Sequence, residues 1–357
     1  MYETRFKSRA FMEGSGNVAN IRDLAKEAGV SVATVSRVLN GYPYVSEEKR
    51  KAVWEAAQKL QYVKNIQAVH LAKGRTAIVG VMLPYIHHPY FSAVIEGISK
   101  EALRYGYQLL LFQTNYEVER ELEALERLRM KQMDGLIVCS HEVDWEAFAA
   151  YQEDGPIVLC EQVERYDFFT VYIDHYQAFV QALRYLIKKG HRRIGYCIGR
   201  MTGPNSQARA GAYQDVLREV GVLPRRQWVF DGCLFLEDGK RVMEQWIAME
   251  ERPSALLVTS DQVAAGIVLH ARRIGVRIPD ELAVIGFDND PLAEMLGITT
   301  VALPILRSGK ERSAFFTIGW RQAVWRENRK SCLPGCWCGI RHNKAWLSVS
   351  DNQLKAK

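Results

Sequence analysis

The sequence predicts an all-α helix-turn-helix domain at the N-terminus, followed by an α/β core of two doubly wound parallel-sheet lobes. The stretch AKEAGVSVATVSRVLNG (residues 25–41) holds two short helical patterns separated by one tight turn that contains glycine. From residue 76 onward, continuous apolar strands alternate with amphipathic helices, which is typical of parallel sheets covered on both faces. The 357 residues leave room for two or three such domains.

Charge is distributed unevenly along the chain. Residues 1–74 carry 12 Lys and Arg against 7 Asp and Glu, and residues 75–304 carry 24 against 31. Residues 305–357 carry 11 against 3. A basic head on an acidic body indicates that the head contacts a polyanion and that the body does not.

The composition predicts a cytoplasmic protein without a membrane partner. Apolar runs such as AIVGVML (residues 77–83) are far shorter than the ~20 residues needed to span a bilayer. The first residues lack the apolar core of a secretory signal, and residues 1–18 are expected to be a disordered extension. Seven scattered cysteines, an odd number, favour reduced thiols over a disulfide framework.

Residues 19–63 are predicted to form three helices. Asn20 can cap the first helix, and Gly29 ends it because glycine adopts a left-handed conformation at little cost. Ser31 can cap the second helix and Ser46 the third. The pattern predicts the helix-turn-helix motif, whose second helix enters the major groove of DNA; a small helical bundle without DNA is the alternative.

The phase of the second helix predicts which side chains contact DNA. With Val35 and Val38 in the core, Arg37 points outward and can donate two hydrogen bonds to a guanine edge, worth ~1–3 kcal/mol of discrimination. Val32 and Ala33 offer apolar contact, for instance to a thymine methyl group. Phosphate or positioning contacts are expected from Thr34, Asn40, Tyr44 and Tyr62. The remaining contacts expected in this domain are Ile21, Ser31 and Ser36.

Residues 64–75 are predicted to be a hinge helix or a plain linker. The segment is too short to be a stable helix in water by itself, so it would fold only when docked. Leu71 could insert between base steps in the minor groove, and Asn65 is a further expected DNA contact.

The body is predicted to consist of a first lobe, residues 76–175, and a second lobe, residues 176–301. In the first lobe, a helix over residues 92–105 follows the first strand. A ligand cleft is expected at the carboxyl ends of the strands. The sequence has no P-loop and no GxGxxG, and this region has neither metal-ligand spacing nor a nucleophile–base pair, so an enzyme is poorly supported and no cofactor is expected.

The chain resembles the LacI/GalR (lactose repressor) family of bacterial transcription regulators. The resemblance rests on NIRDLAKEAGVSVATVSRVLNG, KKGHRRIGYCIG and RIPDELAVIGFDN, and it extends in order over residues 19–304. It implies a core like a periplasmic sugar-binding protein and a homodimer on a pseudo-palindromic double-stranded DNA operator. It also implies a repressor that is controlled allosterically by a small effector in the cleft, which can be a sugar, a sugar phosphate or a nucleoside.

The resemblance assigns further site residues. Leu71 would be the hinge wedge, with Ala68 beside it in the groove. Arg209 and Asp288 would be charged clamps on a polyhydroxy ligand, because charged groups form strong hydrogen bonds to hydroxyls. The effector contacts that it implies are Tyr90, Phe91, Asp174, Arg209, Asp261 and Asp288. Cys160-Glu161-Gln162 stands where many relatives have Asp-Arg, and His175 where Asn is usual, which leaves the ligand class open.

Residues 302–357 depart from the pattern. A helix and a strand that return to the first lobe are expected here, but the segment contains four of the eight Trp, three of the seven Cys and few acids. The break in composition suggests a shifted reading frame or a replaced end. A zinc set is the weaker interpretation, because its spacing is unusual; it would comprise Cys332, Cys336, Cys338 and His342.

Two other classes of function compete with a DNA-binding regulator. Small-molecule transport receptors share the expected core, but they need a signal peptide and have no counterpart of residues 25–40. An enzyme on a doubly wound fold would need a catalytic constellation, which the sequence lacks.

Overall fold

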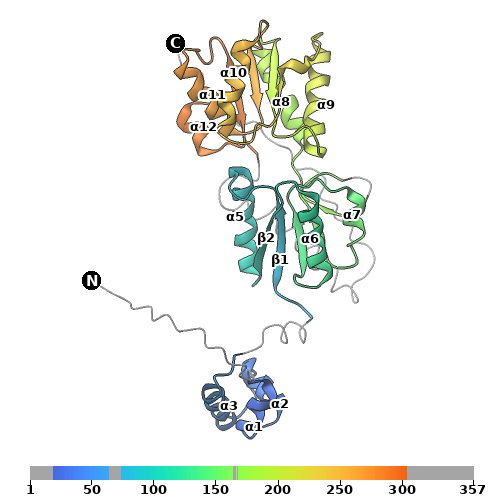
Figure 1. Ribbon diagram of the computed structural model, residues 1–357, viewed down its shortest axis with the longest axis vertical. Coiled ribbons are helices and arrows are strands. Elements are labelled where there is room, and N and C mark those ends of the chain that lie inside the picture. The colour runs from blue at the N-terminus through green and yellow to red at the C-terminus, as the bar shows by residue number, and fades with distance from the viewer. Residues whose placement is uncertain (1–18, 64–73, 164–165, 167, 304–357) are drawn as a thin grey trace, which may run out of the picture. The chain divides into compact units, whose positions relative to one another are not determined.

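The computed structural model describes residues 19–63, 74–163, 166 and 168–303, and its contacts divide the chain into two compact units after Arg75 (Figure 1). Within the described residues, no helix combines the length and the apolarity needed to cross a bilayer. The predictions for residues 1–18, for the hinge contacts Asn65, Ala68 and Leu71, and for the tail after residue 303 fall outside the described residues.

The first unit contains three helices around a small apolar core. They are α1 (Ile21–Glu27), α2 (Val32–Leu39) and α3 (Glu47–Lys59). Leu24 of α1, Val35 and Val38 of α2 and Val53 of α3 are buried together. Val35 and Val38, which the phase of the second helix was expected to place in the core, therefore do lie there.

Side-chain caps define the ends of the first two helices. The Asn20 side chain accepts hydrogen bonds from the amides of Arg22 and Asp23, and the Asp23 carboxylate accepts one from the Asn20 amide at 2.9 Å, which completes a capping box. Ser31 Oγ accepts from the Thr34 amide at 3.2 Å. Ser46 occupies the N-cap position of α3, but its side chain makes no cap hydrogen bond.

The second unit begins with lobe 1, a name used here for the five-stranded parallel sheet β2-β1-β3-β4-β5 and its helices. The strands are β1 (Ile78–Leu83), β2 (Gln108–Gln113), β3 (Gly135–Val138), β4 (Ile157–Leu159) and β5 (Phe169–Thr170). The helices are α5 (Pro89–Arg104), α6 (Val118–Arg129) and α7 (Trp145–Ala149).

Alternation along β1 explains why lobe 1 has helices on both faces. Val81 and Leu83 belong to the buried cluster that includes the α5 residues Val94 and Ile98. Met82, which points to the opposite face, belongs to the cluster formed with α6 and α7. Because both faces are covered, the strands are continuously apolar, as the sequence predicted.

Lobe 2 is the second five-stranded parallel sheet, of order β10-β9-β8-β6-β7, with its helices. The strands are β6 (Ile194–Cys197), β7 (Val229–Phe230), β8 (Ala255–Val258), β9 (Ala283–Phe287) and β10 (Thr299–Val301). The helices are α8 (His175–Lys188), α9 (Pro204–Glu219), η1 (Arg226–Trp228), α10 (Asp238–Ala248), α11 (Asp261–Arg273) and α12 (Pro291–Leu296). Buried clusters place α8 and α9 on one face of this sheet and α10 and α11 on the other.

The predicted architecture of a helix-turn-helix domain and two doubly wound parallel-sheet lobes is confirmed. The predicted start of the first core helix is wrong: α5 begins at Pro89 and not at Ser92, because proline is well suited to the first turn of a helix. Tyr90 and Phe91 consequently lie in the first turn of α5. The elements α7, η1, α10, α12, β5, β7 and β10 were not predicted.

Candidate functional site

The outward face of α2 carries the side chains predicted to contact bases. Val32 is 41% exposed, and Ala33 and Arg37 are also exposed, while Val35 and Val38 are buried. Ser36 is half-buried and lies 3.4 Å from the Asn40 side-chain nitrogen. This helix therefore presents a mixed apolar and cationic surface that suits base edges in a major groove.

The other predicted DNA contacts in this unit differ in how accessible they are. Tyr44 is 95% exposed, and the Ser31 and Thr34 hydroxyls are hydrogen-bonded to each other at 3.0 Å at the start of α2. Ile21 and Tyr62 are half-buried and pack against the helical core. Most of the side-chain area of these last two residues is thus used for packing.

A cavity of about 110 Å³ lies in the second unit, where the carboxyl ends of strands from both lobes converge. Lobe 1 contributes side chains that follow β1, β2, β3 and β4, and lobe 2 contributes side chains that follow β6, β7, β8 and β9. The polar and aromatic lining comprises His88, Tyr90, Phe91, Tyr116, Ser140, Glu161, His175, Arg200, Asn205, Ser206, Arg209, Thr259, Ser260 and Asp288.

Arg209 of α9 lies in the wall of this cavity. Its Nη2 donates a hydrogen bond to Nδ1 of His175 at 3.1 Å, and its Nε is buried without a hydrogen-bond partner among the described residues. Because Nδ1 accepts this bond, His175 is neutral and carries its proton on Nε2. Burial, and secondly the positive charge of Arg209, lower the pKa of His175 well below its usual value. His175 thus remains a neutral donor in the cavity.

Asp288 lies at the end of β9 in a backbone conformation that is rare for a non-glycine residue. Its φ is +104° and that of Asn289 is +58°. Asp288 is only 6% exposed, and within the described part of the chain no group donates a hydrogen bond to its carboxylate. Burial raises the pKa of Asp288 well above its usual value, the Asp261 carboxylate raises it further, and Arg209 opposes the shift. An unpartnered acceptor therefore faces the cavity.

The structure gives Asp261 a different position from the predicted one. Asp261 does not line the cavity; its Oδ2 accepts a hydrogen bond from the Asp290 amide at 2.7 Å, and its Oδ1 accepts one from Thr300 Oγ1 at 2.7 Å. Gly286 makes room for this carboxylate, because a Cβ on that residue would lie 2.0 Å from Oδ1. Asp261 thus anchors the turn that carries Asp288.

Asp174 is also outside the cavity lining. It caps α8, where its Oδ1 accepts a hydrogen bond from the Gln177 amide at 2.9 Å. Of the six predicted effector contacts, the structure therefore brings together Tyr90, Phe91, Arg209 and Asp288. Asp174 and Asp261 are not among them, because backbone amides already use their carboxylates.

Several lining residues were not predicted. Burial lowers the pKa of His88 to about 4, and its Nδ1 is buried without a partner among the described residues. Tyr116 and Arg200 stack, with the guanidinium carbon 3.9 Å from the ring centre. Glu161 and His175 stood out in the sequence only as departures from the family pattern. That departure was the one available signal, since nothing local marks the other residues.

Comparison with known proteins agrees with this geometry. The chain matches the family model described as "Bacterial regulatory proteins, lacI family" over residues 20–65. It matches "Periplasmic binding proteins and sugar binding domain of LacI family" over residues 76–307.

Individual relatives cover most of the chain. The uncharacterized HTH-type transcriptional regulator YkvZ of Bacillus subtilis is 45% identical over 83% of this chain and 92% of its own length. A LacI family regulator from Lactobacillus casei, solved with bound glucose, is 27% identical with a TM-score of 0.63, covering 69% of this chain and 94% of its own. The lac repressor dimer, solved with operator and the anti-inducer ONPF, shares the fold with a TM-score of 0.72 at 21% identity, over 88% of this chain and 94% of its own.

Proposed function

The chain belongs to the LacI family of bacterial regulatory proteins, and on that premise we propose that it is a repressor controlled by a neutral, monosaccharide-sized effector. It binds a pseudo-palindromic operator as a homodimer, in the cytoplasm where bacterial DNA is found. The observation that carries the proposal is the cavity between the two lobes, which Arg209 and Asp288 line together with aromatic side chains.

The charges in the cavity favour an uncharged ligand over a sugar phosphate. Two carboxylates, Glu161 and Asp288, line it, and Arg200 is already paired with Glu142. A phosphate would therefore find a single guanidinium in the cavity lining, that of Arg209, without a carboxylate partner among the described residues, and no second unpaired Arg or Lys beside it. Hydroxyl groups, in contrast, can donate to Asp288 and accept from Arg209 and His175.

The size of the cavity favours a single sugar ring. At roughly 10–15 Å³ for each water molecule, the cavity has room for on the order of ten waters. A monosaccharide has about that number of non-hydrogen atoms. The glucose bound to the Lactobacillus casei relative supports the same ligand class for this chain.

An apolar surface on lobe 1 supports dimer formation. Leu110 and Leu111 of β2, at the edge of the sheet, are 36% and 37% exposed, and Leu103 of α5 is 71% exposed. An exposed edge strand beside apolar side chains is a surface that a second copy would cover. The dimeric lac repressor provides a precedent for such an assembly in this fold.

The effector controls DNA binding by linkage. A ligand that bridges the lobes changes their relative angle, and DNA and effector then alter each other's affinity by the same factor, typically ~1–3 kcal/mol. The direction of this coupling follows from which lobe arrangement the operator-bound dimer prefers.

Two measurements test the proposal. In gel shifts with genomic fragments, the affinity should fall steeply with salt, as counterion release requires. In a thermal-shift screen, neutral monosaccharides should raise the melting temperature, whereas sugar phosphates and nucleosides should not. Absence of binding to every fragment, with and without ligand, would exclude a DNA-binding regulator; stabilisation by sugar phosphates alone would exclude the ligand class.

A further inference from the structure

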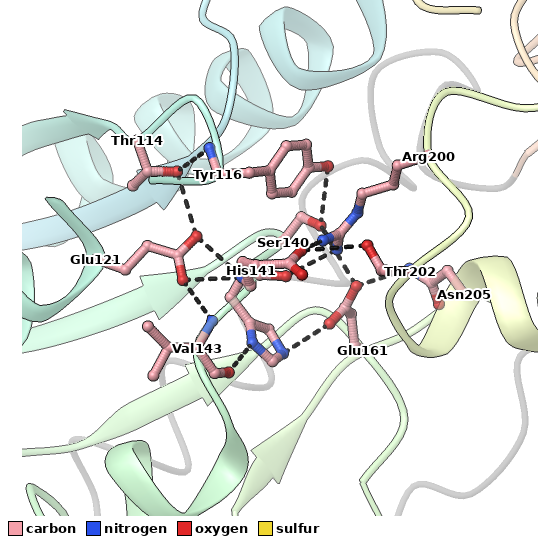
Figure 2. Close-up of polar contacts among 11 residues, drawn as sticks. Thr114, Tyr116, Glu121, Ser140, His141, Val143, Glu161, Arg200, Thr202 and Asn205 are labelled. Carbon is pink, nitrogen blue, oxygen red and sulfur yellow. Dashed lines mark hydrogen bonds and ion pairs between the residues drawn. The ribbon is translucent and has the colours of Figure 1, made fainter. Parts of the chain in front are cut away.

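The segment of residues 199–205, which comprises the loop after β6 and the first residues of α9, reaches from lobe 2 to lobe 1 beside the cavity. Figure 2 shows Arg200, Thr202 and Asn205 of this segment meeting Ser140 and Glu161 of lobe 1. The donors of this contact come from lobe 2 and the acceptors from lobe 1. The hydrogen-bond donors of lobe 2 therefore match the acceptors of lobe 1, and the contact between them lies in the wall of the proposed effector site.

Arg200 makes most of the hydrogen bonds in this contact. Its Nη1 is hydrogen-bonded and ion-paired to the Glu142 carboxylate, and its Nη2 donates to the His141 carbonyl oxygen at 2.7 Å and to Ser140 Oγ at 3.3 Å. Its guanidinium also stacks on Tyr116. The Arg200 side chain is only 18% exposed. A shielded, multiply bonded arginine of this kind contributes more than an exposed surface pair.

Within each lobe, further contacts fix the position of the residues that meet at this contact. In lobe 1, the buried Glu121 carboxylate accepts hydrogen bonds from the Glu142 amide and from the Val143 amide, both at 2.8 Å. In lobe 2, Gly203 has a φ of +89°, and a Cβ there would lie 2.6 Å from Arg200 Nη2. Glycine thus lets the guanidinium fold back across the loop before it enters lobe 1.

A second link joins the lobes next to Arg200. Asn205 Nδ2 donates to Glu161 Oε1 at 3.1 Å, and Glu161 Oε2 lies 3.0 Å from His141 Nε2. His141 Nδ1 lies 2.6 Å from the Val143 carbonyl oxygen and must carry a proton, because a carbonyl can only accept. His141 Nε2 and Glu161 Oε2 are buried within ion-pair distance of each other, and neither atom has a hydrogen-bond partner among the described residues. With these partners, Glu161 is engaged by the protein.

We propose that Arg200 is a positioning residue that latches lobe 2 to lobe 1. Its bonds to Glu142, to the His141 carbonyl and to Ser140 keep the two walls of the cavity together, so that the effector meets a site already assembled. Apparent affinity scales with the population of the competent arrangement, and the latch therefore sets the effector affinity by holding that arrangement together. The part concerning the effector rests on the proposed function; the latch itself does not.

Hydrogen exchange of the effector-free, full-length protein tests the latch. Arg200→Ala should speed exchange in residues 139–143 of lobe 1 by about tenfold or more, because charge-assisted hydrogen bonds are worth ~1.5–3 kcal/mol. Glu142→Gln keeps the size of the side chain and should give a smaller rise in exchange in residues 199–205 of lobe 2. It provides the same test if Arg200→Ala does not fold. The Arg200→Ala/Glu142→Gln double variant should exchange no faster than Arg200→Ala.

A matched control is Arg184→Ala, which removes an exposed ion pair with Glu219 inside lobe 2. It should leave residues 139–143 unchanged. The proposal is overturned if Arg200→Ala speeds exchange only within residues 199–205, or if the effects of the two single substitutions simply add.

Titration with D-glucose separates the latch from the proposed function. Arg200→Ala should raise the Kd for D-glucose about tenfold or more, and Arg200→Lys should recover only part of the loss, because an ammonium cannot form the same fork or stack. If the wild-type protein does not bind D-glucose, D-glucose is excluded as the effector. The hydrogen-exchange result then still tests whether Arg200 holds the two lobes together. If glucose binds equally to both proteins while exchange changes, the link to affinity is wrong.

Discussion

The Asp261 carboxylate and the Thr300 hydroxyl are joined by a hydrogen bond of 2.7 Å, and together they hold the turn that carries Asp288. Thr300 Oγ1 also accepts a hydrogen bond from the Asn289 amide at 3.2 Å. Both Asp288 and Asn289 have positive φ, and this pair keeps them there. Asp261 therefore affects the cavity indirectly, by fixing the backbone of the turn that positions Asp288.

The first prediction concerns this support. Asp261→Ala should weaken effector binding although its side chain does not line the cavity, since the turn loses two hydrogen bonds. Thr300→Val removes the hydroxyl while keeping the shape, and it should reproduce part of the loss. Calorimetric titration with the sugar identified by screening measures both. Unchanged affinity in Asp261→Ala, in a protein that is folded by circular dichroism, would contradict this role.

The second prediction concerns pH. Burial raises the pKa of Asp261 to about 7, against hydrogen bonds from Thr300 and Asp290 that lower it. The folded state thus binds a proton that the unfolded state releases near its ordinary pKa of about 4. The free energy of unfolding should fall as pH rises from about 4 to about 7, by at most ~1.4 kcal/mol per pH unit from this group, and then level off.

Asp261→Asn cannot titrate and should remove this part of the slope. Denaturant unfolding at pH 5 and pH 8 measures the difference between the two proteins. Identical pH dependence in wild type and Asp261→Asn would show that Asp261 binds no extra proton in the folded state. Asp288, whose pKa is also raised, adds a slope of the same sign to both proteins.

The third prediction separates the cavity from the helix cap. Arg209→Ala or Asp288→Ala should each reduce sugar affinity roughly 10- to 100-fold, as expected when a charge-assisted hydrogen bond is lost. Asp174→Ala should leave affinity unchanged and lower stability by ~1 kcal/mol, because it removes only a helix cap. Titration and thermal unfolding of the three variants provide the comparison. Loss of affinity in Asp174→Ala would place that carboxylate in the site after all.

The fourth prediction concerns reading of DNA by α2. Arg37→Ala should cost ~1–3 kcal/mol of binding to the preferred operator and relax specificity at one base pair. Lys51→Ala changes an exposed side chain of α3 and should have little effect on sequence preference. Gel shifts against an operator library test both variants. A uniform loss across all sequences in Arg37→Ala would assign it a phosphate contact.

The fifth prediction concerns the caps of the first unit. Asn20→Ala should destabilise this unit by ~0.5–2 kcal/mol because it breaks a capping box. Ser46→Ala should cost less, since the Ser46 side chain makes no cap hydrogen bond. Thermal unfolding followed by hydrogen exchange in α1 and α3 distinguishes them. Equal destabilisation would contradict the observed difference between the two caps.

Local features were predicted well because their causes lie within a few residues. The caps at Asn20 and Ser31, the buried face of α2 and the alternating strands depend on neighbours in the chain. The roles of Asp174 and Asp261 could not be predicted from neighbouring residues in this way. A carboxylate after a strand can face a ligand or bind backbone amides, and only the path of the surrounding loop decides between these.

By itself, the sequence determined the helix-turn-helix domain and the two parallel-sheet lobes, and its resemblance to the LacI family pointed to Arg209 and Asp288 as expected site residues. The tertiary structure alone decided that Asp261 supports Asp288 and that Arg200 joins the lobes through Glu142. Helical phase, strand alternation and capping are short-range properties that one sequence displays directly. The partners Arg200 and Glu142 lie far apart in the chain, and they meet only because two separately folded sheets direct the ends of their strands at one cavity.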